Sequence, residues 1–123
     1  MAKIPAQKME GGSIGTPEVI GTFNDGVSTY TRYRKIIDGG TLNLTQSGTN
    51  YVYTKSLNTP NIHGILSANV ILSLSGTTFQ PLPYTNRLIS YYLSNTDITI
   101  ISNDSTTPSA FNGRKVIISL EYY

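Results

Sequence analysis

Apolar and polar side chains alternate most regularly in residues 114–123. The side chains expected on the buried face of this segment are Val116, Ile118, Leu120 and Tyr122. A period of two is typical of a strand that has one buried and one exposed face. A strand in this position can be held only by pairing with strands that come earlier, so we expect it to close a sheet.

Short extended segments separated by turn residues recur through residues 18–113. Strands are expected at residues 19–23, 29–37, 41–44, 51–55, 69–75, 77–80, 87–93 and 98–102. Loops are expected at residues 56–64 and 103–113, and no stretch shows the period of a helix. This spacing favours an all-β fold, either an antiparallel β-sandwich of jelly-roll-like type or a small barrel.

Two glycine-containing segments are predicted to delimit the first strands. Asn24–Gly26 is a strong signal for a tight turn, because asparagine and glycine tolerate the positive φ that such turns require. Asp38–Gly40 is expected to end the second strand.

Residues 1–17 differ from the rest, because prolines and glycines interrupt the segment and its charged side chains keep it polar. One interpretation is a flexible tail. The other, which we favour, is an extended arm that orders on a neighbouring subunit and is anchored by Ile4, Met9 and Ile14. The expected organisation is therefore an N-terminal arm over residues 1–17 and one domain over residues 18–123.

The composition excludes several classes of protein. The 123-residue chain has no cysteine, so neither a disulfide framework nor a thiolate metal site is available. Only 13% of its residues are charged and the net charge is +2, unlike the basic surface of a nucleic-acid-binding protein. No apolar run has the length of a transmembrane helix or the features of a signal peptide. We therefore expect a soluble protein that binds no nucleic acid and does not insert into a membrane.

No residue pattern indicates catalysis, a metal or a cofactor. His63 is the only histidine and lies in a predicted loop, where a polar surface role is the usual one. Asp97 and Asp104 could meet across a hairpin as a carboxylate pair or a Ca²⁺ site, but aspartate in turns ordinarily caps the backbone. The basic and aromatic segment 30–35 favours cross-strand packing over stacking on a nucleic acid. The sequence thus predicts a protein that is not an enzyme.

The tyrosines are the best candidates for a binding surface. The chain has nine of them, too many for all to be buried, and neighbours in a strand point to opposite faces. Exposed tyrosine beside asparagine, serine and threonine is typical of surfaces that bind sugars or protein partners. The candidates are Tyr51, Tyr53, Tyr91 and Tyr92, together with the loops 56–64 and 103–113. Of the two uses, we favour packing against another subunit over a glycan site.

Several segments resemble a β domain common in the tail and fibre proteins of tailed bacteriophages. Glu18–Gly26, with Phe23 at the aromatic position, is followed by Tyr30 as in the opening of that domain. Phe79–Tyr84 resembles its Leu-Pro corner, and Val116–Tyr122 its final strand, which often ends in Glu-Tyr. The resemblance covers residues 18–123 and rests on aromatic, glycine and turn positions.

The resemblance implies a non-enzymatic structural protein of a bacteriophage virion, made in the cytoplasm of the bacterial host. It would be a fibre, tail or head-fibre component that projects from the particle and contacts the host surface. Its partners would be other virion proteins and further copies of itself, most often in a trimer, and a host-surface glycan is its candidate ligand. Two alternatives remain, namely a capsid decoration protein attached through its N-terminal arm and a carbohydrate-binding module that recognises a receptor.

Overall fold

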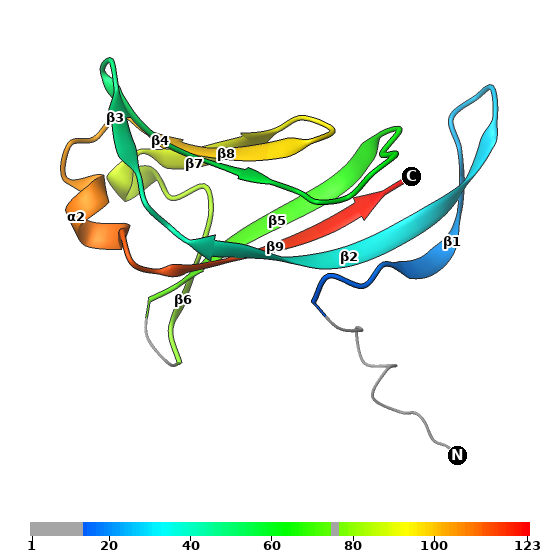
Figure 1. Cartoon of the computed structure of the whole chain (residues 1–123), viewed down its shortest axis with the longest axis horizontal. Coiled ribbons are helices and arrows are strands. Elements are labelled where there is room, and N and C mark those ends of the chain that lie inside the picture. The colour runs from blue at the N-terminus through cyan, green and yellow to red at the C-terminus, as the bar shows by residue number, and fades with distance from the viewer. Residues whose placement is uncertain (1–13, 75–76) are drawn as a thin grey trace.

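The computed structural model describes residues 14–74 and 77–123, and in these two ranges the chain is almost entirely β-structure (Figure 1). The described residues form nine strands, one short α-helix and one turn of 3-10 helix. All strand pairs within the two sheets are antiparallel. The predicted all-β class is therefore confirmed.

The larger sheet has five strands in the order β1-β2-β9-β5-β6. Its strands are β1 (Glu18–Asn24), β2 (Thr29–Thr41), β9 (Lys115–Tyr122), β5 (Ile65–Ser73) and β6 (Phe79–Pro81). The smaller sheet has four strands in the order β3-β4-β8-β7. Its strands are β3 (Thr45–Ser47), β4 (Asn50–Ser56), β8 (Asp97–Ser102) and β7 (Ile89–Leu93). The 3-10 turn η1 (Thr85–Arg87) precedes β7, and the helix α2 (Thr107–Phe111) precedes β9.

The last strand is the centre of the larger sheet. β9 pairs with β2 on one side and with β5 on the other. Its four predicted inward side chains are all buried, with exposed fractions of 0% for Val116, Ile118 and Leu120 and 5% for Tyr122. The prediction that this segment closes a sheet is confirmed.

The two sheets share one hydrophobic core. In Figure 1, β4, β7 and β8 lie across from β2, β5 and β9. Buried side chains from both sheets form a single cluster, which includes Ile98 and Ile100 of β8 as well as Val70 and Leu72 of β5. Burial of this apolar surface is the main force that holds the sheets together.

Two tyrosine hydroxyl groups of the smaller sheet also join the two sheets. The Tyr53 hydroxyl of β4 donates a hydrogen bond to the Gly39 carbonyl of β2 at 2.6 Å. The Tyr91 hydroxyl of β7 donates to the Ala68 carbonyl of β5 at 3.0 Å. These contacts fix the position of one sheet relative to the other, because a hydrogen bond is directional and hydrophobic burial is not.

The turn predicted at Asn24–Gly26 is confirmed. The Asp25 carboxylate accepts hydrogen bonds at 2.9 Å from the backbone N–H groups of Val27 and Ser28. These bonds lower the pKa of the Asp25 carboxyl, the Ser28 bond contributing most. Gly26 has a φ of +97°, which glycine adopts without steric cost.

The prediction that Asp38–Gly40 ends the second strand is wrong. The register between β2 and β9 shifts between Asp38 and Thr41, and β2 continues through this bulge to Thr41. Gly40, with a φ of +75°, supplies the positive φ of the bulge. Residues such as Asp38–Gly40 often end a strand at a turn, but in this protein they allow β2 to bend and continue.

The strand predicted at residues 41–44 does not form. Leu42 and Leu44 are buried, but their backbone N–H groups donate to the Arg114 carbonyl and to the Asn112 side chain. The alternating apolar side chains therefore anchor the connection between β2 and β3 in the core. β3 begins only at Thr45.

The loop predicted at residues 103–113 contains the helix α2. Pro108 lies at the start of this helix, and Thr107 and Phe111 are its buried side chains. Proline is favoured in the first turn of a helix. Five residues are too few to produce a detectable helical period, which explains why the sequence pattern does not predict it.

The N-terminal arm lies largely outside the described residues. Ile4 and Met9 are in the range that the structure does not describe. Ile14 forms a parallel bridge with Ile36 of β2 and is 59% exposed, and the Gly15 N–H donates to the Ile36 carbonyl at 2.7 Å.

None of the helices in the described residues is long and apolar enough to cross a membrane.

Candidate functional site

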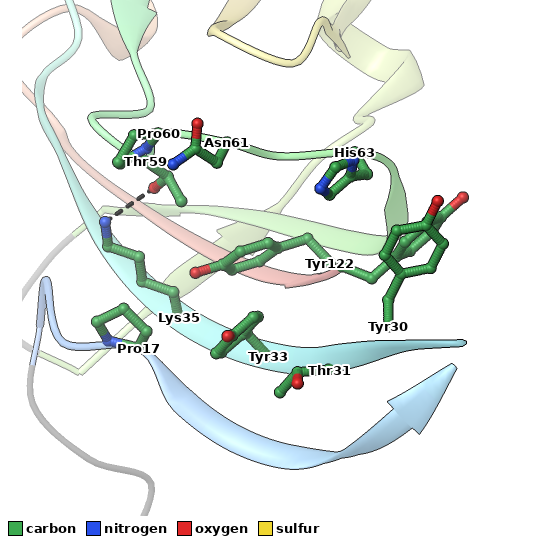
Figure 2. Close-up of a pocket in the computed structure, with 11 residues that line it drawn as sticks. Pro17, Tyr30, Thr31, Tyr33, Lys35, Thr59, Pro60, Asn61, His63 and Tyr122 are labelled. Carbon is green, nitrogen blue, oxygen red and sulfur yellow. Dashed lines mark hydrogen bonds between the residues drawn. The ribbon is translucent and has the colours of Figure 1, made fainter. Parts of the chain in front are cut away.

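A cavity of about 430 Å³ opens beside the N-terminal half of β2 (Figure 2). Four parts of the chain line it, namely Pro17, β2, the loop between β4 and β5, and the last two residues of the chain. β2 is the longest strand, and in Figure 1 the end of β2 that is joined to β1 extends past the smaller sheet. Part of the larger sheet therefore remains uncovered there, and the cavity lies at this end.

Two of the β2 side chains that line the cavity share a face of the strand with a core residue. Tyr33, Lys35 and Ile37 share one face of the strand. Ile37 lies in the core, whereas Tyr33 and Lys35 line the cavity. One face of the strand thus supplies both the edge of the core and the base of the cavity.

Five of the eleven residues that line the cavity carry aromatic rings. Tyr33 stacks on Tyr122 with ring centroids 5.4 Å apart and an interplanar angle of 24°. Tyr30 contacts His63 at 4.9 Å and Tyr123 at 5.0 Å between ring centroids. Ring pairs at these separations are favourable beyond the apolar area that they bury, so the rings support one another.

Phe23 of β1 does not line the cavity but adds a further ring to this aromatic cluster. Its ring centroid lies 4.6 Å from that of Tyr123. The Tyr123 main-chain oxygen accepts hydrogen bonds from the N–H groups of His63 at 2.7 Å and Gly64 at 3.2 Å. The position of the Tyr123 ring is therefore fixed from two sides.

The loop over the cavity is held firmly by its own residues. Leu57 and Ile62 are buried, with exposed fractions of 0% and 8%, and anchor the two ends of the loop in the core. Between them, Asn58 and Asn61 adopt positive φ angles of 49° and 61°. Asparagine is one of the few residues other than glycine that adopts this conformation readily.

Lys35 is the buried cation of the site. Its exposed fraction is 6%, and its Nζ donates to the Asn58 carbonyl at 3.0 Å and to Thr59 Oγ1 at 2.8 Å. In residues 14–74 and 77–123 the one ion pair joins Arg34 and Glu18, so no carboxylate of these ranges lies within 4.0 Å of the Lys35 ammonium. The ammonium group has three donors, and two of them are used by the loop.

Tyr122 lies next to Lys35 in the cavity. Burial raises the pKa of the Tyr122 phenol, and the neighbouring Tyr33 raises it further. Figure 2 shows the Tyr122 hydroxyl directed toward the Lys35 side of the cavity. With its raised pKa, the Tyr122 hydroxyl keeps its proton at neutral pH and can donate a hydrogen bond to a bound group.

The four tyrosines proposed from the sequence do not line this cavity. Tyr51, Tyr53 and Tyr91 pack against the core, and the last two also bind carbonyl groups of the opposite sheet. Tyr92 is 58% exposed and lies opposite Thr99 on the outer face of the smaller sheet. The four side chains therefore do not form one surface.

Other sequence candidates have structural roles. Asp97 and Asp104 lie at opposite ends of β8 and its continuation, with no cluster of metal-ligating side chains anywhere in the two described ranges. Asp104 accepts hydrogen bonds from the Thr106 hydroxyl at 2.7 Å and the Thr106 N–H at 2.8 Å. The Thr106 bonds lower the pKa of the Asp104 carboxyl.

The sequence contains two partial signals for the cavity. The segment 30–35 mixes tyrosines with basic residues, and the loop 56–64 was a candidate binding segment on composition. What sequence reasoning missed is that these segments meet Tyr122 and Tyr123. That meeting follows from the pairing of β9 with both β2 and β5, because β5 comes directly after this loop.

A second cavity of about 400 Å³ lies near β7. Its lining includes Pro83, Leu88 and Ile101, and no charged side chain contributes to it. It lacks the combination of rings and a buried cation that the first cavity has.

An alkaline titration tests the environment of the buried tyrosines. Burial raises the pKa of Tyr53 and Tyr122 above the ordinary 10.0, with smaller contributions from Asp38 and Tyr33 respectively. Each phenol therefore ionises at higher pH in the folded chain than in the unfolded chain. The stability that they contribute should be complete below about pH 10 and be lost as the pH rises through the raised values.

The measurement is the free energy of unfolding in urea at several pH values between about 8 and 12. Tyr53→Phe should show a shallower alkaline decrease than the original chain. Tyr92→Phe, at an exposed site, is the matched control and should retain the original slope. An unchanged slope in Tyr53→Phe would contradict the role of its buried hydroxyl.

Comparison with known proteins identifies no relative of this chain. No protein-family model, curated protein or solved structure matches the chain.

Proposed function

We propose that this protein is a non-enzymatic structural component of a tailed-bacteriophage virion, located in a fibre, the tail or a head fibre, and that it contacts the host surface. The observation that carries the proposal is that aromatic residues from two of the segments on which the phage resemblance rests lie together. Tyr30 and Tyr122 both line the cavity, and Phe23 contacts Tyr123 in its wall. The opening segment and the final strand of the resembling domain thus contribute to one site, whereas Phe79 and Tyr84 of the third segment do not line it.

The chemistry of the site favours binding over catalysis. Its lining combines aromatic rings with hydroxyl and amide groups and one lysine. Such a mixture suits recognition of a ligand that has both apolar faces and hydroxyl groups. A host-surface glycan has both, so the proposed ligand is a carbohydrate.

The proposed architecture is a jelly-roll-like β-sandwich over residues 18–123. In support, the chain moves repeatedly between the sheets, with β2, β5 and β9 adjacent in one and β4, β7 and β8 adjacent in the other. β1, β6, β3 and β7 are edge strands, and β3 and β6 have only three residues each. Association into a trimer, as in fibre-type domains, would protect the longer edges β1 and β7.

Copy number in purified particles tests the proposed position. Quantitative mass spectrometry of the phage particle should find this protein at a count many times smaller than that of the major capsid protein. Absence from purified particles would refute a virion role. A count comparable with the capsid protein would favour shell decoration instead.

The decoration alternative rests on the N-terminal segment, because Ile14 is exposed beside β2 and leads to the remainder of the proposed arm. Its test is a variant without residues 1–13, which retains the Gly15–Ile36 hydrogen bond and Pro17 of the cavity wall. If the arm is the attachment device, the variant should fold but no longer bind particles. Retained binding would exclude attachment through residues 1–13.

A further inference from the structure

We infer that the cavity binds an acidic sugar, with the pyranose ring against the tyrosine rings and its carboxylate next to the Lys35 ammonium. The inference rests on the proposed function, because it specifies the class of glycan that the same site would take. Three observations carry it, namely the charge of the cavity, the nature of its walls and the pairing of β2 on both of its edges.

The charge argument begins with the burial of Lys35. Lys35 is 6% exposed, and lysines are rarely buried to this degree unless they are paired. Its partners, the Asn58 carbonyl and the Thr59 hydroxyl, are neutral. An anionic group in the cavity would supply the missing counter-charge and accept the third donor of the ammonium group.

The Thr59 side chain holds the ammonium in place. Its hydroxyl donates to the Leu57 carbonyl at 2.8 Å and so presents a lone pair to Lys35 Nζ. The loop therefore fixes the cation before any ligand arrives. A fixed donor loses less conformational entropy on binding than a free lysine side chain does.

The walls favour a sugar over a small carboxylate. Tyr30, Tyr33 and Tyr123 are partly exposed rings that line the cavity, and His63 adds a further polar ring. The volume of about 430 Å³ falls in the usual range of ligand pockets, roughly 300–1,000 Å³. Ring faces contact the C–H groups of a pyranose, while the tyrosine hydroxyls and the Asn61 amide can bind its hydroxyl groups.

A peptide fits this cavity less well. Extended peptides usually bind by adding a strand to a free sheet edge. β2 is already paired on both sides, with β1 and with β9. The N–H groups of His63 and Gly64 are also occupied, because both donate to the Tyr123 oxygen.

The test compares two sugars that differ only in the group at C6, which is charged in one and neutral in the other. Methyl β-D-glucuronide carries a carboxylate where methyl β-D-glucoside carries a hydroxymethyl group. Titration of the full chain, followed by NMR shifts of backbone amides, should give a dissociation constant at least about ten-fold lower for the glucuronide. The largest shifts should lie in residues 30–35, 59–63 and 122–123.

Two variants and a matched control locate the charge. Lys35→Met should abolish the preference, so that both sugars bind equally, whereas Lys55→Met of β4, whose side chain is not in the cavity lining, should retain it. Tyr30→Ala should weaken both sugars by a similar factor and leave their ratio unchanged. The comparison in the original chain stands even if Lys35→Met fails to fold.

Three results would overturn the inference: equal affinity for the two sugars in the original chain, binding of neither sugar, or displacement of the glucuronide by acetate at equal concentration. The last result would indicate a carboxylate site without a sugar site. None of them bears on the count of this protein in phage particles. The failure of the inference and the failure of the proposed function are therefore separate outcomes.

Discussion

Replacing Ile118 with alanine should lower the free energy of unfolding by about 3 kcal/mol, within the roughly 2–5 kcal/mol found when large core side chains are truncated. Ile118 lies in the middle of β9 with an exposed fraction of 0%. Its partners in the flanking strands are Ile37 and Val70, which are themselves in the core. Since core residues surround the site on both sides, the structure can close the resulting space only in part.

Ile117→Ala is the matched control, because Ile117 is the same residue type on the opposite face of the same strand. It is half-buried, and its cross-strand partners are Asp38 and Ile71. The decrease in the free energy of unfolding in Ile117→Ala should be less than half of that in Ile118→Ala. The measurement is urea unfolding with comparison of both midpoint and slope. Equal losses at the two positions would mean that another subunit or residues 1–13 cover the outer face of this sheet.

The prediction of β9 succeeded because its alternation had a single interpretation. Val116 and Leu120 can face only one way if Lys115 and Glu121 are to remain in contact with water. The segment Tyr51–Tyr53 has no such asymmetry, because Val52 is as apolar as its neighbours. Which face of β4 turns inward was therefore not decided by the sequence pattern.

The inward position of Tyr53 also depends on a feature that composition does not reveal. A tyrosine can be buried without large cost only if its hydroxyl finds a partner. The Gly39 carbonyl is that partner, and Gly39 lies in the bulge of β2. Since the sequence pattern predicted the end of the strand there, the acceptor could not be foreseen.

The candidate site was hidden for a related reason. Tyr33 meets Tyr122 through the pairing of β2 with β9, and Lys35 meets Thr59 because the loop between β4 and β5 lies against β2. The sequence pattern predicted that β9 pairs with earlier strands but could not predict which one. Once β2 is known to be its neighbour, the location of the cavity follows from the alternation of side chains along both strands.

The bulge supports a second prediction with a large effect. Gly39→Ala should lower the free energy of unfolding by about 3 kcal/mol, at the upper end of the cost of overpacking. A Cβ atom at Gly39 would lie 2.6 Å from Val116 Cγ1, 2.8 Å from Val116 Cβ and 3.0 Å from the Val116 carbonyl oxygen. Two of these contacts involve atoms that no change of rotamer can move, so β2 and β9 must separate locally.

A double-mutant cycle with Val116→Ala isolates the cause. The second change removes the Cγ1 contact but leaves the other two, so it should relieve about 1 kcal/mol of the Gly39→Ala loss. Val70→Ala is the control, because Val70 is a buried valine of β5 that pairs with Ile118 rather than with β2. Its effect should add to that of Gly39→Ala without coupling. If the effects of Val116→Ala and of Val70→Ala both simply add to that of Gly39→Ala, β2 moves away from β9 as a unit. The Tyr53–Gly39 hydrogen bond would then be broken as well, and the alkaline dependence of stability assigned to Tyr53 would disappear in the Gly39→Ala variant.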